Sequence, residues 1–113
     1  MTGVQTCALP IYPPPSPAQL EKAKKAFQDG KKLHGEGKLP ESIEKFKESY
    51  RLSKNPLLLY NIGFTMDEAQ MEDLALFYYR KFLADAPQDA AQRESVVERV
   101  KVLEQQVAKL RGG

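Results

Sequence analysis

The sequence holds few of the residues on which disulfide frameworks, metal sites and catalytic dyads depend. Its 113 residues include one cysteine, one histidine and no tryptophan. A single cysteine excludes an intramolecular disulfide, and the lone imidazole of His34 does not make a zinc site. The sequence contains no glycine-rich phosphate loop and no Gly-x-Ser-x-Gly elbow. We therefore expect no cofactor, no metal ion and no enzymatic activity in this chain.

An excess of one charge and long hydrophobic runs are lacking too. Lys and Arg number 17 against 15 Asp and Glu, a formal net charge of +2. This balance is too even to indicate a nucleic-acid partner or a membrane surface. No apolar run approaches the roughly 20 residues that cross a bilayer, which argues against direct membrane insertion. The length and the hydrophobic content of 42% allow one small domain.

The first eleven residues show no helical or strand period. Residues 4–11 resemble the translation of a common sequencing adapter in one reading frame. We therefore expect residues 1–11 to be a library artefact, with the true N-terminus and any signal peptide or fused domain missing; the alternative is an ordinary tail. Either way they are excluded from fold reasoning. Residues 12–16 are typical of a short polyproline spacer, so we expect residues 1–15 to form a disordered tail.

The centre of the chain, residues 55–87, has the apolar spacing of two helices folded back on each other. One helical face carries Leu59, Ile62, Gly63 and Met66 at i, i+3, i+4 and i+7. In the second half, one face of the predicted helix carries Ala75, Tyr79, Phe82, Leu83 and Ala86 at helical spacing. Most of its other positions are apolar too, at Leu74, Leu76, Phe77 and Tyr78. A helix that is apolar nearly all round needs neighbours on more than one side. We expect this helix in the middle of a stack.

A similar pair of helices is predicted in residues 16–53. Ser16 and Gln19 have the spacing of a capping box, with Pro17 at the first helical position. The first helix is expected to end near Gly35. The predicted second helix begins near Pro40, and its apolar positions are Leu39, Ile43, Phe46 and Tyr50. Asn55 before Pro56 then predicts the start of the third helix.

The two pairs are self-similar, with a period near the ~34 residues of a helix-turn-helix repeat. Aligned positions are Gly30 with Gly63, Leu33 with Met66, Ser42 with Ala75, and Phe46 with Tyr79. We predict that the glycines mark the closest approach of the two helices in each pair. The small and large positions that follow then let the second helix pack into the first.

With these positions and the LLYNIG run at residues 58–63, the chain resembles tetratricopeptide repeats of bacterial type. The resemblance covers residues 20–87. It implies an all-α, right-handed helical-repeat solenoid with repeats at residues 20–53 and 55–86. Two positions depart from the family pattern: Lys54 replaces a repeat-closing proline, and Asp29 replaces a large apolar residue. We therefore expect the first repeat to be a weaker, terminal unit.

A long final helix is predicted over residues 88–111. Its apolar residues alternate by four and three, and are Val96, Val100, Leu103, Val107 and Leu110. A repeat stack needs its last apolar face covered, which favours a capping helix. The same heptad seam also fits a homodimeric coiled coil. The sequence leaves both interpretations open.

The resemblance to tetratricopeptide repeats implies a concave, peptide-binding groove lined by the first helix of each pair. The residues expected there are Lys24, Phe27, Lys31, Tyr60, Asn61 and Phe64, and the same two stripes include His34, Leu57 and Asp67. Aromatic anchors, an amide and two lysines suit a peptide with an acidic group. We therefore expect a non-catalytic module that binds a protein or peptide partner.

Two other functions stay open. The chain can be an assembly or scaffold segment that homodimerises through its last helix. It can also be a regulatory fragment of a larger kinase or envelope protein. Bacterial repeat proteins of the kind it resembles often follow a signal peptide and a proline-rich spacer, which favours the cell envelope or periplasm over the cytoplasm. The carboxylates at the turn after the third helix lack the spacing and the glycine of a calcium loop, so we expect a solvated turn there.

Overall fold

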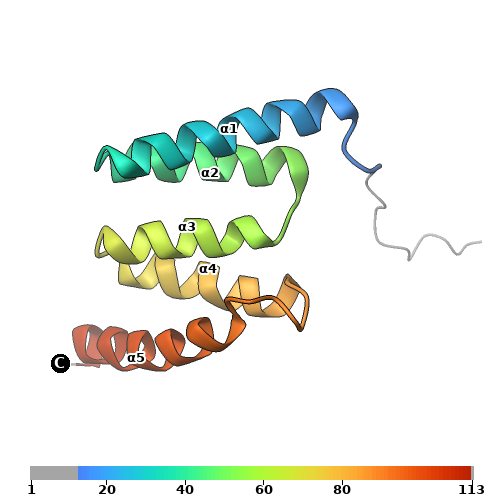
Figure 1. Cartoon of the computed structure of the whole chain (residues 1–113). Helices are drawn as coiled ribbons and strands as arrows, with labels where there is room; N and C mark the ends of the chain where they lie inside the picture. Colours follow the sequence, from blue (N-terminus) through green and yellow to red (C-terminus); the bar gives the residue numbers. More distant parts are fainter. Residues whose placement is uncertain (1–12, 113) are drawn as a thin grey trace, which may run out of the picture.

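The structure of this protein is a computed structural model that describes residues 13–112; the expectation for residues 1–11 lies outside them. In the described part the chain forms five α-helices and no strand: α1 (Pro17–Gly35), α2 (Leu39–Ser53), α3 (Leu57–Glu68), α4 (Glu72–Asp85) and α5 (Arg93–Gly112). The helices follow one another from the top to the bottom of Figure 1, and each packs on the next. The predicted all-α class is confirmed. Within these residues, no helix combines the length and the apolar character needed to span a bilayer.

Local sequence sets the start of α1 and of α3. The Ser16 hydroxyl accepts a bond from the Gln19 N–H at 3.1 Å, and the Gln19 side chain accepts one from the Ser16 N–H at 2.9 Å. This is the predicted capping box. The Asn55 side-chain oxygen accepts a bond from the Leu57 N–H at 3.0 Å, which satisfies a donor that has no partner within α3. Both helix starts therefore follow from short side chains that bond to the backbone.

The end of α2 explains one departure from the repeat pattern. Lys54 closes this helix in the left-handed region, with φ 57°, and its N–H donates to the Tyr50 carbonyl at 2.7 Å. A proline ring fixes φ near −65°. Proline at this position is therefore incompatible with the turn that the chain makes here.

The last helix begins later than the sequence predicts. The prediction placed its start at residue 88, directly after Pro87, but α5 begins at Arg93, after a turn. The Arg93 guanidinium donates to the carbonyls of Leu83 and Ala86, at 3.0 and 3.3 Å. These carbonyls lie at the end of α4, where the helix itself supplies no donors. Arg93, the first residue of α5, thus links the start of this helix to the end of α4.

Both helix pairs meet at a glycine. A Cβ atom built on Gly30 would lie 2.8 Å from two ring carbons of Phe46, and one on Gly63 would lie 3.0 Å from Cδ1 of Tyr79. In addition, the buried Ser42 hydroxyl donates to the Gly30 carbonyl at 2.8 Å. The close approach predicted from the two aligned glycines is confirmed. In each pair an aromatic ring of the second helix occupies the space that a side chain on the first would need.

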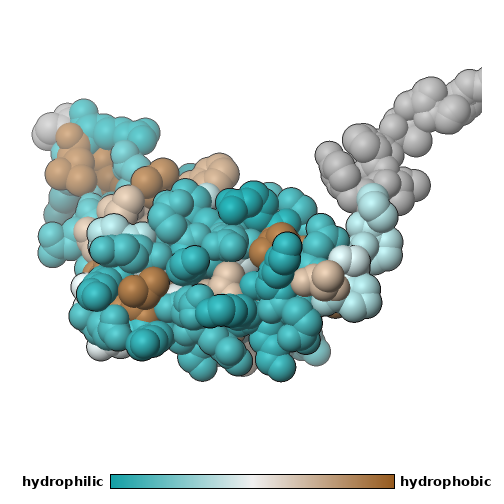
Figure 2. Space-filling model, turned by 90° about the horizontal axis from the view of Figure 1, so that it is seen from above, coloured by the Kyte–Doolittle hydropathy of each residue, from teal (hydrophilic) through white to brown (hydrophobic). Residues whose placement is uncertain are grey.

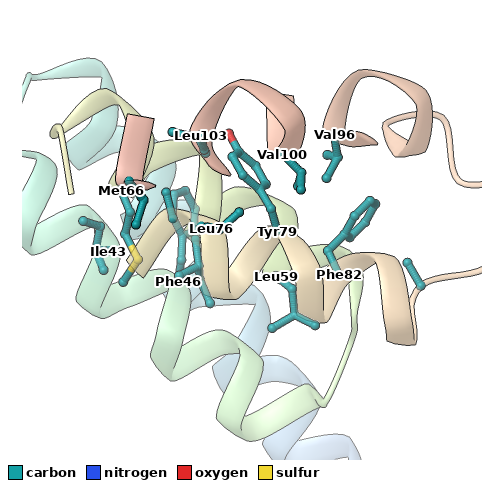
Figure 3. Close-up of a cluster of buried hydrophobic side chains, with 14 residues drawn as sticks. Ile43, Phe46, Leu59, Met66, Leu76, Tyr79, Phe82, Val96, Val100 and Leu103 are labelled. Atoms are coloured by element: carbon teal, nitrogen blue, oxygen red, sulfur yellow. The ribbon is translucent and has the colours of Figure 1, made fainter. Parts of the chain in front are cut away.

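The core runs through α2, α3, α4 and α5. Its fully buried side chains include Leu59, Ile62, Phe82 and Leu103. Figure 3 shows side chains of α5 directed at Tyr79 and Phe82 of α4. The heptad seam of α5 is accordingly buried within the chain at Val96, Val100, Leu103 and Val107, whereas Leu110 is 74% exposed.

The helix α4 packs on two neighbours and leaves another side exposed. The side chains of Leu76, Tyr79 and Phe82 in α4 are buried, but Leu74 is 45% exposed and Phe77 is 57% exposed. The principal packing neighbours of α4 in the described chain are α3 and α5. The prediction that this helix has neighbours on more than one side is therefore confirmed, and the side that carries Leu74 and Phe77 is left exposed.

A polar network joins α3, α4 and α5. The Asp67 carboxylate, whose side chain is 13% exposed, accepts bonds from Nε and Nη2 of Arg99 at 2.7 and 2.8 Å. The Tyr79 hydroxyl donates to the same carboxylate at 3.2 Å. Two parallel bonds from one guanidinium fix both partners in place. Burial, and then the negative charge of Asp67, raises the pKa of the Tyr79 phenol.

We expect this buried phenol to destabilise the fold at alkaline pH. Tyrosine in an unfolded chain loses its proton near pH ~10, whereas the raised pKa keeps Tyr79 neutral in the folded chain. Stability from this group is therefore complete below about pH 10 and falls above it, by up to about 1.4 kcal/mol per pH unit. Urea unfolding on both sides of this pH measures the loss, which is expected to be smaller in Tyr79→Phe. Equal losses in the two proteins would contradict the assignment.

Candidate functional site

Two adjoining hollows are lined mainly by residues of α1 and α3. The larger, of about 460 Å³, has Lys24, Phe27, Leu57 and Asn61 in its lining. The smaller, of about 260 Å³, has Lys31, His34, Tyr60, Asn61 and Phe64 in its lining. Asn61 borders both hollows and connects them. We refer to the two together as the α1–α3 groove.

Aromatic rings form much of the groove wall. Phe27 packs on Phe46 of α2, with ring centroids 5.8 Å apart, and Tyr60 stacks on Phe64 at 5.7 Å. Tyr60 also contacts Phe82 of α4 at 5.9 Å, so it is held from behind and is half-buried. Phe64 is 39% exposed. Of the two rings, Phe64 offers more surface to a ligand, and Tyr60 mainly supports the ring of Phe64.

Asn61 lies at the junction of the two hollows with its amide unused. Its backbone carbonyl accepts a bond from the Thr65 hydroxyl at 2.8 Å. Its side-chain amide makes no hydrogen bond to any residue between 13 and 112, although the residue is half-buried. A carboxamide offers two donors and one acceptor. It can therefore bond both the C=O and the N–H of an extended peptide.

Positive charge lies along α1, and a carboxylate lies at one end of the groove. The Lys31 ammonium lies 5.4 Å from the Phe27 ring centroid, within cation–π range, and Lys24 is exposed. At the far end, His34 Nε2 lies 2.5 Å from Glu68 Oε1, which links the ends of α1 and α3. A ligand in the groove thus meets two cations along one wall.

The structure brings together the residues that the sequence assigned to a groove, and their role in binding a peptide stays a prediction. All six predicted groove residues line the α1–α3 groove, as do His34 and Leu57. Asp67 does not line it, because its carboxylate is held by Arg99 and Tyr79. Gln92, in the turn before α5, also lines the groove, and no helical period pointed to it.

No protein-family model and no curated protein matches the chain. Residues 13–112 contain no group of three carboxylate, histidine or thiol side chains placed to hold a metal ion. The groove residues offer aromatic, amide and ammonium groups.

Proposed function

We propose that this protein is a non-catalytic helical-repeat module of the tetratricopeptide type that binds a protein or peptide partner in the α1–α3 groove. The repeat character is supported by the equivalent contacts of Gly30 with Phe46 and of Gly63 with Tyr79. Sequential packing of the helices also supports it. The observation that carries the binding function is the unbonded amide of Asn61, half-buried between the two hollows of one groove.

Both ends of the helical stack support this proposal. Figure 2 looks down on the end formed by α1 and α2, whose surface is mostly hydrophilic with separate hydrophobic spots. A terminal unit of a repeat array has such a polar outer face. At the other end, α5 buries its apolar seam against the preceding helices. A homodimeric coiled coil through that seam requires α5 to leave α4, which favours the capping role.

The test uses a peptide selected against the immobilised full chain from a random library. We expect Asn61→Ala to raise the Kd of that peptide by ten- to a hundredfold. The physical reason is the loss of two hydrogen bonds, worth about 1.5–3 kcal/mol together. Fluorescence anisotropy of the labelled peptide measures the change.

The matched control is Gln105→Ala, which removes an exposed amide from α5, outside the groove. It is expected to leave the Kd unchanged. Because both side chains lie on helices and neither belongs to the core, circular dichroism should show the same helicity in both variants. Equal affinity of all three proteins, or a library that yields no binding peptide, would contradict the proposed function.

A further inference from the structure

A separate hollow, of about 240 Å³, lies between α2 and α4. We call it the α2–α4 notch. Four of its lining residues are cationic: Lys47, Arg51, Lys54 and Lys81. The other four are aromatic or apolar: Tyr50, Ile62, Phe77 and Tyr78. No carboxylate belongs to the lining, and none of these residues lines the α1–α3 groove.

Helical spacing brings the notch residues to one surface. Residues 47, 50, 51 and 54 follow i, i+3, i+4 and i+7, so they share one face of α2 and its C-terminal end. From α4, the ring of Phe77 meets that of Tyr78 edge to face, with centroids 5.2 Å apart. Ile62 of α3 is fully buried and closes the floor. The result is an apolar floor with cations around it.

The positive charge of the notch is only partly neutralised by the chain itself. Lys81 lies 3.2 Å from Asp85, and Lys47 lies 3.8 Å from Glu44. Lys54 lies over the Tyr50 ring at 5.7 Å from its centroid, and Arg51 makes no ion pair with any residue between 13 and 112. The ion pairs of Lys81 and Lys47 are exposed, and exposed ion pairs contribute little stability. A ligand's carboxylates can therefore replace them and also pair with Arg51.

The larger hollow between α4 and α5, of about 720 Å³, lacks this charge asymmetry. There the Arg80 guanidinium lies 2.6 Å from the Glu104 carboxylate, and that of Arg111 lies 3.4 Å from Asp73. Both arginines are thus paired with carboxylates of the same lining, and the third cation, Lys81, pairs with Asp85. The lining of that hollow therefore favours neither an acidic nor a basic ligand. The lining of the notch favours an acidic ligand.

We infer that the α2–α4 notch is a second docking site, and that it takes an acidic segment of a partner protein in which one apolar side chain is flanked by Asp or Glu. The exposed ring of Phe77 and the half-buried rings of Tyr50 and Tyr78 receive the apolar side chain, and the notch has room for only one such side chain. The four cations receive the flanking carboxylates. This inference goes beyond the proposed function, because it uses other residues and does not require an occupied groove.

A polypeptide fits the notch better than a single-stranded nucleic acid does. Nucleic-acid strands bind along extended basic grooves, with successive bases stacked on aromatic faces. Here the rings of Phe77 and Tyr78 stand at 87° to each other, so they do not form a continuous stacking platform. The formal net charge of +2 also leaves no long basic stripe.

The experiment titrates the isotope-labelled full chain with a short synthetic peptide that has one phenylalanine flanked by glutamates. Amide chemical shifts are expected to move around Tyr50, Arg51 and Phe77, and not around Asn61. A peptide with alanine in place of phenylalanine is expected to bind at least about tenfold more weakly, as is an oligothymidylate of equal charge. Shifts confined to the α1–α3 groove, or equal binding of the three probes, would overturn the inference.

Two matched pairs of variants test the residues. Arg51→Glu is expected to weaken the phenylalanine peptide at least about tenfold, whereas Lys32→Glu makes the same charge change in the last turn of α1 and is expected to have little effect. Phe77→Ala is likewise compared with Leu74→Ala, an exposed apolar residue of α4 outside the notch. Equal losses within either pair overturn the inference. Binding of a groove-selected peptide should stay unchanged in Arg51→Glu, so the two proposals fail independently.

Discussion

Replacing Gly30 with valine is expected to lower the free energy of unfolding by about 3 kcal/mol. Even a methyl group at this position would come within 2.8 Å of the Phe46 ring. That ring is buried and packs on Phe27, so it has little freedom to move aside. Valine therefore forces α1 away from α2. Its helix propensity is only slightly better than that of glycine and offsets little of the loss. Urea unfolding followed by circular dichroism measures the effect.

The matched control is the same change at Gly35, the last residue of α1. No atom outside its own helical turn lies within 4 Å of a Cβ built there, so Gly35→Val is expected to change stability by less than about 0.5 kcal/mol. Adding Phe46→Leu to Gly30→Val is expected to cost less than the sum of the two single changes, because the smaller side chain makes room. Equal effects at Gly30 and Gly35, together with additive costs in the double variant, would show that the helices do not meet at Gly30.

Replacing Phe82 with alanine is expected to cost still more, about 4 kcal/mol. The Phe82 ring is fully buried, contacts Tyr60 of α3 at 5.9 Å and faces Val96 of α5 in Figure 3. Its loss leaves a cavity where three helices meet. Domains of this size are commonly stable by about 5–15 kcal/mol. The variant should therefore unfold at a much lower urea concentration than the wild type.

Phe77→Ala provides the comparison for Phe82→Ala, since it removes the same side chain from the same helix. Phe77 is largely exposed, so its truncation is expected to change the free energy of unfolding by less than about 1 kcal/mol. Similar losses for the two variants would contradict the placement of α4, with one face against α3 and α5 and another towards solvent.

Local pattern was sufficient to predict the helix pairs. The apolar spacing of residues 55–87 is set by the helical period, and the bonds between Ser16 and Gln19 are formed within one turn. The aligned glycines, Gly30 and Gly63, were predictive because each pair repeats the same contact. The same reasoning failed at the start of the last helix, where contacts between helices are involved. The helix α5 begins at Arg93, which bonds carbonyls of α4, and no periodic pattern encodes that bond.

The candidate site was predictable to the extent that it follows helix faces. Spacing put Asn61, Phe64 and Asp67 on one helix face, and the resemblance to tetratricopeptide repeats assigned that face to the groove, but Asp67 lies outside it. Arg99, 32 positions further along the chain, holds its carboxylate. The α2–α4 notch was missed because its residues come from three helices, α2, α3 and α4. In the sequence, Tyr50 was interpreted only as an apolar position of the second helix. Lys54 was interpreted only as a residue that replaces the repeat-closing proline of the family pattern.

The most direct test is paramagnetic broadening by a spin label attached to the end of the selected peptide. Bound in the α1–α3 groove, the label is expected to weaken the amide signals of Phe27, Asn61 and Phe64, from α1 and α3, and to leave those of α5 beyond Leu103 unchanged. The Asn61→Ala variant should lose this broadening at the same peptide concentration. Broadening that spares α1 and α3 and falls on α4 and α5 would contradict the account.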